Sequence, residues 1–268
     1  MSPIEARYGQ TVEAAFPALN ETMETLLAHR SVRSFLETPL PAGMLELLIA
    51  AAQSAPSSSN LQIWSVVAVE DSARKTRLAD YAGQQRHIKQ APLFLVFLAD
   101  MAMLQEAATT QQAPLAGADY FDTFLMAAID AALAAQNVVT AAESMSLGTV
   151  YAGAIRNQPE EVVRELNLPP HVFPVFGLSV GYPDPEHPAR VKPRLPQRAA
   201  LHREQYSSDD TQQAIADYDE IMAAVYRAYR ETGTTWSKQS LARLHGPESL
   251  AGRDRLKEAI RKQCILLK

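Results

Sequence analysis

An uninterrupted apolar run of strand length, LFLVFLAD at residues 93–100, places the strongest constraint on the fold of this chain. A strand with one face in water alternates apolar and polar side chains, whereas a continuous run is typical of a strand covered on both faces. Three further short apolar runs, at residues 64–69, 148–154 and 172–182, are predicted as strands. With 268 residues, 47% of them hydrophobic, the chain is long enough to bury a core around these runs.

Helical patterns separate the four runs, which indicates a layered α+β or α/β domain and leaves the strand order open. The N-terminal residues are polar, and the segment with threonines, glutamines and Pro114 that follows residue 100 is predicted as a linker. The last helix is expected to be one of two that follow Asp209, with Leu256, Ile260, Cys264 and Leu267 on one buried face. The other helices are predicted at 41–55, at 71–90 from a cap at Asp71 or Ser72, at 120–146 with Gly148 as its cap, and from Pro159.

Composition excludes several classes of protein. A single cysteine, Cys264, rules out a disulfide framework and suits a reducing cytoplasm, and no secretory signal is visible at the N-terminus. The net charge of -5 argues against a nucleic-acid binder. The apolar stretch at 120–142 is interrupted by Asp122, Asp130, Gln136 and Asn137, so a buried helix is favoured over a membrane span.

Sequence motifs of several common enzyme classes are absent. The chain contains no G-x-S-x-G, no H-E-x-x-H, no phosphate-binding P-loop and no G-x-G-x-x-G. Its six histidines are scattered, and none has the spacing of a metal ligand. We therefore expect no metal site.

Two basic clusters could bind an anion. HRSVR at residues 29–33 carries two arginines, a histidine and a serine hydroxyl, and KPR at 192–194 holds two cationic side chains on either side of a proline that restrains the backbone. A phosphate would suit both clusters. Taken alone, either cluster is more typical of solvated charges paired with nearby glutamates.

Two segments of small residues could receive a flat ligand. In APSSSNLQ, residues 55–62, small hydroxyl side chains between a helix and a strand can donate hydrogen bonds to a polar heterocycle. In VYAGA, residues 150–154, small side chains at a strand end allow close approach to backbone N–H groups. An ordinary serine loop and a tightly packed turn explain the two segments equally well.

Together and in this order, these segments resemble the FMN-dependent nitroreductase superfamily, in particular its oxygen-insensitive, NADPH-preferring nitroreductase and flavin reductase group. The resemblance extends from about Met23 to Trp236. It is carried by HRSVRSF, APSSSNLQIWS, AGQQRHIKQAP, AAQNVVTAAESMSLGTVYAGAIRN, LPPHVFPVFGLSVGYP and KPRLP.

The resemblance implies a three-layer α+β sandwich with a central, mainly antiparallel sheet flanked by helices, in a domain-swapped-style homodimer. Residues 1–200 would form the FMN-binding core and residues 201–268 a helical extension that packs on the core or the partner subunit. The FMN-binding residues that it implies are His29, Arg30, Ser31, Lys192 and Arg194 at the phosphate and ribityl chain, Arg33 and Gln85 at the pyrimidine, Ser57, Ser58, Ser59 and Asn60 from the partner subunit, and Tyr151, Ala152, Gly153 and Ala154 near flavin N5.

The implied activity is reduction of nitroaromatics, quinones or free flavins by NADPH or NADH, with hydride passing through flavin N5 in ping-pong turnover. No catalytic side chain is required, and Arg33 would tune the flavin by stabilising negative charge at the pyrimidine. Of the basic loop that binds the 2′-phosphate of NADPH in this group, only Arg227 and Arg230 are present, so NADH use stays open. A dedicated flavin reductase and a flavin-binding sensor or storage protein are the alternatives, and the residues do not identify the acceptor.

Overall fold

The computed structural model describes residues 1–12, 16–229 and 232–268. The chain forms two compact units, one of residues 1–30 with 190–250 and one of residues 31–189 with 251–268. This grouping differs from a division at residue 200, because the first thirty residues pack with the segment that follows Ala189. A separate helical extension at 201–268 stays a prediction.

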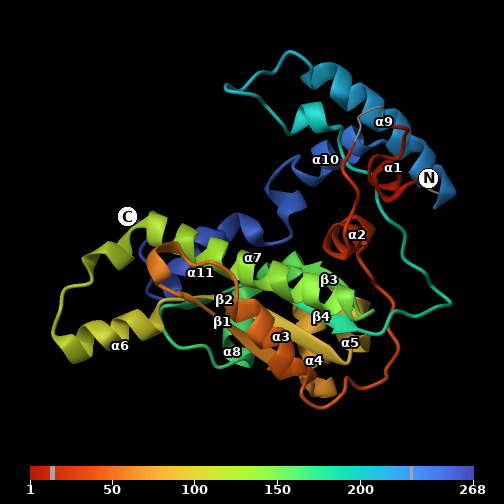
Figure 1. The fold of residues 1–268 in the computed structure, drawn as a ribbon. Coiled ribbons are helices and arrows are strands. Elements are labelled where there is room, and N and C mark those ends of the chain that lie inside the picture. Colours follow the sequence, from red (N-terminus) through yellow and green to blue (C-terminus); the bar gives the residue numbers. More distant parts are fainter. Residues whose placement is uncertain (13–15, 230–231) are drawn as a thin grey trace. The chain divides into compact units, whose positions relative to one another are not determined.

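The larger unit contains the sheet and most of the helices (Figure 1). Its strands are β1 (Trp64–Val69), β2 (Leu93–Asp100), β3 (Gly148–Ala152) and β4 (Val172–Gly181). Its helices are α3 (Met44–Gln53), α4 (Ser72–Tyr81), α5 (Arg86–Gln90), α6 (Ala102–Gln111), α7 (Phe121–Ser144), α8 (Pro159–Glu165) and α11 (Leu256–Lys262). The smaller unit contains α1 (Pro3–Tyr8), α2 (Glu21–Ala28), α9 (Thr211–Ala228) and α10 (Trp236–Arg243).

The four strands lie in the order β1-β2-β4-β3, and every neighbouring pair is antiparallel. The expected antiparallel sheet is therefore confirmed. β2 lies inside the sheet, and its first seven residues are buried, as the uninterrupted apolar run predicted. β3 is an edge strand, so one of its sides is available to other parts of the chain.

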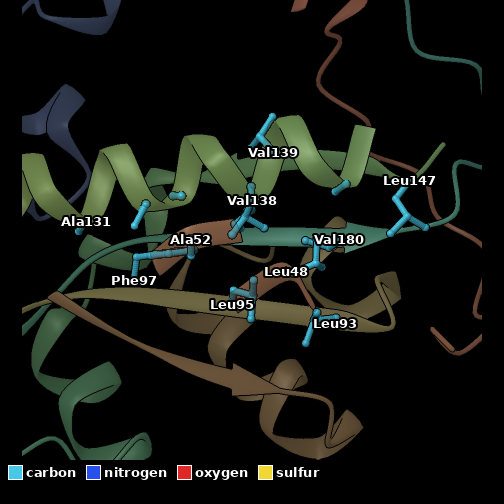
Figure 2. Packing of buried hydrophobic residues seen from close by; sticks show 14 residues of the cluster. Leu48, Ala52, Leu93, Leu95, Phe97, Ala131, Val138, Val139, Leu147 and Val180 are labelled. Carbon is cyan, nitrogen blue, oxygen red and sulfur yellow. The ribbon is translucent and has the colours of Figure 1, made fainter. Parts of the chain in front are cut away.

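Alternate residues of β2 supply two separate cores. Leu95 and Phe97 pack with α3 and α7 on one face of the sheet, where Figure 2 shows Ala131 and Val138 of α7 near the strands. Phe94 and Val96 pack on the other face with α4, α5 and α8. Helices on both faces of one sheet give the larger unit its three layers.

Among the described helices, α7 alone is long and apolar enough to cross a membrane by length and composition. It carries Asp130, which is 1% exposed, and its alanine and valine side chains pack on the sheet. These contacts are those of a core helix in a layered domain, as the polar interruptions of the stretch predicted.

Two expectations about α7 and the C-terminus are wrong. α7 ends at Ser144, and the turn to β3 is made by Ser146 in the left-handed region (φ 63°), so Gly148 starts the strand and does not cap the helix. α11 ends at Lys262, before Cys264, which has a φ of 60° and is exposed. The pattern had suggested a buried helical cysteine because the apolar spacing continues past the true helix end.

Three helices were missed and the C-terminal count was too low. α1, α2 and α6 lie in segments that looked polar, and residues 209–268 form α9, α10 and α11 where two helices were expected. The signals for α1 were present: Ser2 and Glu5 form a capping box, Pro3 begins the helix, and Gly9 ends it in the left-handed conformation. With six residues, α1 is too short to show the apolar repeat on which the prediction depended.

A polar pair is buried between α5 and β4. His87 is 5% exposed, and its Nδ1 lies 3.0 Å from the hydroxyl oxygen of Ser179. Burial lowers the pKa of His87 from about 6.5 to about 4, and the positive charge of Arg33 acts in the same direction. His87 is therefore a neutral packing residue at neutral pH.

The depressed pKa of His87 predicts a pH dependence of stability. Between pH 6.5 and 4 the unfolded chain protonates this histidine and the folded chain does not, so the free energy of unfolding falls as pH falls through this window. From pH 7.5 to pH 5.0 this group alone contributes a loss of about 2 kcal/mol. In His87→Gln, the free energy of unfolding measured with urea should fall between pH 7.5 and pH 5.0 by about 2 kcal/mol less than in the wild type.

The matched control is His245→Gln, because His245 is exposed on the surface. It should keep the wild-type difference between the two pH values. An unchanged difference in His87→Gln would contradict the assignment.

Candidate functional site

The first basic segment begins where α2 ends. Asn20 caps α2 at its N-terminus through a hydrogen bond from the Met23 amide, and His29 is the residue at its C-terminal cap. Arg30 is exposed, and its Nη1 donates to the carbonyl of Ala28 at 3.3 Å. The helix end thus places a half-buried imidazole next to an exposed guanidinium.

The rest of this segment belongs to the larger unit. Ser31 forms an isolated bridge with Thr149 of β3, and the Val32 amide donates to the Thr149 carbonyl at 2.9 Å. Val32 is buried, so Arg33, the next residue, is turned to the surface and is exposed. This alternation fixes which of the neighbouring side chains can meet a ligand.

The second basic segment is held by its central proline. Pro193 is buried, and its carbonyl accepts a hydrogen bond of 2.7 Å from the hydroxyl of Tyr218 on α9. Lys192 and Arg194 on either side are exposed. The proline is the anchor, and the two cationic side chains lie at the surface.

A single buried guanidinium binds the backbone of both basic segments. Nη2 of Arg7 on α1 donates to the carbonyl of His29 at 2.7 Å, and its Nη1 donates to the carbonyl of Lys192 at 3.1 Å. The Arg194 amide donates to the Arg7 carbonyl at 2.9 Å. The structure therefore brings residues 29 and 192, 163 positions apart in sequence, to one side chain.

Among the described residues, no carboxylate pairs with the exposed arginines of these segments. Within residues 1–12, 16–229 and 232–268, Arg30, Arg33 and Arg194 take part in no ion pair. Solvated arginines paired with glutamates, the simpler interpretation of the sequence, therefore do not describe them. Cations clustered without counter-charges are suited to an external anion such as a phosphate.

The serine-rich loop is held by a buried carboxylate. The Ser57 hydroxyl donates to Asp130 at 2.6 Å and accepts from the Gln62 amide at 2.7 Å, and the Ser58 amide donates to Asp130 at 3.2 Å. The Ser57 hydroxyl is thus used inside the loop. Ser59 and Asn60 are exposed and remain available to a ligand.

This loop also stores backbone strain. Ser59, Asn60 and Gln62 have φ values of 49°, 56° and 52°, in the left-handed region that favours glycine. Each such residue costs about 1 kcal/mol or more, and strain of this kind concentrates at functional sites. The bonds to Asp130 supply the constraint that keeps the loop in this shape.

The end of β3 presents backbone groups at the sheet edge. Because the carbonyl of Thr149 faces Val32, outside the sheet, the backbone groups of Tyr151, two residues further on, face the same side. The side chain of Tyr151 is 38% exposed, with its ring edge-on to Phe176 at 5.3 Å. The strand ends at Ala152, and Gly153 and Ala154 begin a short 3-10 turn.

Tyr151 stays protonated at neutral pH. Burial raises its pKa to about 12, and the negative charge of Glu143 acts in the same direction. Its hydroxyl lies 3.4 Å from the amide oxygen of Gln136 on α7. This neutral phenol donates to Gln136 and packs its ring on Phe176.

Gln85 and Arg33 belong to one neighbourhood. Gln85 is half-buried and forms the N-terminal cap position of α5, the helix that carries His87. The charge of Arg33 helps to lower the pKa of His87, which places Arg33 near this helix. An amide and a guanidinium close together can bind the carbonyl and nitrogen edge of a heterocycle.

The remaining predicted site residues lie on α9 and just beyond it. Arg227 is exposed in the last turn of α9, and its Nε donates to the carbonyl of Ala223 at 3.3 Å. Arg230 lies outside the described residues. In the described part of the chain, no group of three or more His, Cys, Asp or Glu residues could hold a metal ion.

Arg7 and Asp130 are the site residues that the sequence did not reveal. Asp130 was noted only as a polar interruption of an apolar helix. Arg7 had one signal, the capping box and terminal glycine around α1, which would have predicted a helix but not the contacts of its arginine. Both side chains form hydrogen bonds with backbone groups that are distant in sequence. A local sequence motif cannot predict such contacts.

Two protein-family models match this chain. Residues 26–182 match the nitroreductase family, and residues 192–268 match the nitroreductase family C-terminal domain. Residues 1–25, which include α1, lie outside both matches.

Characterised relatives agree with this assignment. The chain is 40% identical over 232 residues to an FMN reductase (NADPH) of Bacillus subtilis, covering 83% of this chain and 91% of the relative. It is 40% identical to an oxygen-insensitive NADPH nitroreductase of Salmonella typhimurium, over 82% and 89% of the two chains. The solved structure of NfrA2 from B. megaterium has a TM-score of 0.87 and 37% identity, over 93% of this chain and all of that one. This chain belongs to the nitroreductase family.

Proposed function

We propose that this chain is an FMN-dependent NAD(P)H:acceptor oxidoreductase that reduces nitroaromatics, quinones or free flavins. The observation that carries the proposal is the joining of two basic segments, residues 29–30 and 192–194, through the guanidinium of Arg7. The relatives add the chemistry, since their names state FMN reductase and NADPH nitroreductase activity. The single cysteine is in keeping with a place in the reducing cytoplasm.

The phosphate of FMN is assigned to the smaller unit. Arg7 binds the backbone of the two segments that carry His29, Arg30, Lys192 and Arg194. Within the described residues, Arg30 and Arg194 have no carboxylate partner. A dianionic phosphate fits this set, because guanidinium groups bind phosphate oxygens in pairs. These four residues would hold the phosphate, and Ser31, the first residue of the larger unit, would be placed at the phosphate and the ribityl chain.

The ring of FMN is assigned to residues of the larger unit. Arg33 and Gln85 would face the pyrimidine, where the guanidinium stabilises negative charge. Tyr151, Ala152, Gly153 and Ala154 would approach the central ring from the end of β3. Ser57, Ser58, Ser59 and Asn60 would come from the partner subunit, Ser57 through its backbone because its hydroxyl is bound to Asp130. When bound, FMN supplies the redox chemistry, accepting a hydride equivalent from the nicotinamide and passing electrons to the acceptor.

A binding and turnover experiment tests this function. The purified protein should be yellow or should bind added FMN, and it should oxidise NADPH or NADH when a quinone or a nitroaromatic is present. Loss of one charge-assisted phosphate contact in Arg194→Gln should raise the Kd for FMN about tenfold. Arg198→Gln is the control, because Arg198 is exposed in the same unit and pairs with Asp217.

Two outcomes would contradict the proposal. A protein that binds no FMN would overturn it entirely. A protein that binds FMN, is reduced by NAD(P)H only slowly under anaerobic stopped-flow, and does not recolour with acceptor would be the sensor or storage protein. A dedicated flavin reductase would turn over free flavin much faster than quinones or nitroaromatics.

The choice of electron donor is assigned to the end of α9. Arg227 is exposed there, and Arg230 follows three positions later in sequence. A guanidinium can bind the 2′-phosphate of NADPH, a group that NADH lacks. We propose that these two arginines set the preference for NADPH.

Kinetics with both donors test this assignment. In Arg227→Ala and Arg230→Ala, kcat/KM for NADPH should fall by about tenfold per lost phosphate contact, while kcat/KM for NADH should stay unchanged. Equal losses with both nucleotides would rule out a 2′-phosphate contact. Equal kcat/KM values for NADPH and NADH in the wild-type enzyme would also rule out a contact with the 2′-phosphate.

An exposed apolar stripe supports a homodimer. Phe121, Leu125, Ile129 and Leu133 recur every four residues on α7 and are 52%, 43%, 48% and 40% exposed. The opposite side of the helix is buried on the sheet. Repeated large apolar side chains on one exposed helix face mark a protein interface. We propose that two copies of the chain pack through this stripe.

A charge placed in the stripe tests the dimer. Ile129→Glu should shift the molar mass measured by light scattering from two chains to one, because a buried unpaired carboxylate is costly. Leu241→Glu, at a 73% exposed position on α10, should leave the mass unchanged. A wild-type protein that is monomeric at micromolar concentration would refute the assembly.

A further inference from the structure

Helix α1 lies outside the part of the chain that matches the family, yet it contacts both basic segments. The family match begins at residue 26, whereas α1 covers Pro3–Tyr8. Arg7, in its last turn, is only 9% exposed. A buried arginine on a short N-terminal helix requires an explanation, because burial of a guanidinium without partners is costly.

The partners of Arg7 include backbone carbonyls from two distant segments. Its Nη2 donates to the carbonyls of Leu27 and His29, both at 2.7 Å, and its Nη1 donates to the carbonyl of Lys192 at 3.1 Å. The planar guanidinium presents its donors in fixed directions, so bonds to three carbonyls fix the relative positions of the two segments. A flexible ammonium group does not impose the same geometry.

Packing around Gly9 holds the end of α1 on the second segment. Gly9 has a φ of 68°, and a Cβ added to it would lie 2.9 Å from Cγ of Pro193 and 2.7 Å from Cγ2 of Ile221. Only glycine allows this approach in this conformation. Tyr218 holds the other side of the same proline through its hydroxyl. α1 and α9 therefore both hold the Lys192–Arg194 segment.

We infer that Arg7 is a positioning residue for the FMN phosphate, bringing His29 and Arg30 to one side of the anion and Lys192 and Arg194 to the other. The carbonyl oxygens of His29 and Lys192 point toward Arg7, because they accept its hydrogen bonds. The side chains of these segments are then free to contact a ligand. The inference rests on the proposed function. It makes the N-terminal helix part of the cofactor site, although Arg7 itself need not touch the cofactor.

The comparison of FMN with riboflavin tests this role, because riboflavin lacks the phosphate. Kd values are measured by flavin fluorescence quenching on protein stripped of bound flavin. In Arg7→Met the Kd for FMN should rise at least about tenfold and the Kd for riboflavin should stay within about twofold of wild type. The Kd for FMN of Arg7→Lys should lie between those of the wild type and Arg7→Met, because lysine keeps the positive charge but lacks the planar set of donors of a guanidinium.

The ionic-strength dependence of FMN binding gives a second readout. Wild-type affinity should fall steeply with added salt, because charges bind a dianion, and the slope should be shallower in Arg7→Met, where fewer cations reach the phosphate. Arg198→Met is the matched control. It removes an exposed arginine of the same unit and should change neither Kd nor slope.

The outcomes distinguish an Arg7 that positions the phosphate-binding residues from an Arg7 that only stabilises the fold. Unchanged FMN binding in Arg7→Met would overturn the inference and leave the proposed function intact, whereas absence of FMN binding by the wild type would overturn both. Equal weakening of FMN and riboflavin with an unchanged salt slope would show a merely structural arginine. If Arg7→Met does not fold, Arg7→Lys and Tyr218→Phe, which loosens the same segment at Pro193, decide by the same two readouts.

Discussion

The complete burial of β2 is the constraint on which the larger unit depends. Leu93, Leu95 and Phe97 point to one core, and Phe94 and Val96 to the other, so a single strand requires helices on both faces of the sheet. Because β2 lies inside the sheet, β1 and β4 must pair on its two sides. β1 and β3 then occupy the two edges, where a strand has backbone groups that no neighbouring strand binds. The turn at Gly153, to which we assign the flavin ring, therefore follows an edge strand.

Much of this fold could be predicted because the apolar side chains of its strands and core helices follow runs or short repeats in the sequence. All four strands were recognised from apolar runs that the structure places in one sheet, and the predicted bounds of each agree with the structure within two residues. The antiparallel pairing came from the family resemblance and not from the runs themselves. The core helices α3, α4 and α7 were visible for the same reason, since apolar side chains at helical spacing identify a helix that packs on a sheet.

The errors lie where the apolar pattern is weak or extends too far. α1 and α6 carry few large apolar side chains, so the propensity of their residues alone could not identify them. Cys264 fits the spacing of α11, but the helix ends at Lys262, where backbone hydrogen bonding turns the chain. Candidate site residues were proposed from the sequence where side-chain type matters, as at Arg30 and Lys192. They were missed where a side chain binds distant backbone, as Arg7 and Asp130 do.

Arg7 and Asp130 act by the same physical principle. Each is a buried charge whose partners are polar groups of a segment that presents exposed side chains: the carbonyls beside His29 and Lys192 for one, the hydroxyl and amide of Ser57 and Ser58 for the other. A buried charge is stable only while those partners stay in place, so displacing the loop leaves the charge without its hydrogen bonds. The cost of that displacement is what makes each loop rigid. The exposed cations beside Arg7 and the strained residues Ser59, Asn60 and Gln62 are thus held in place without an apolar core of their own.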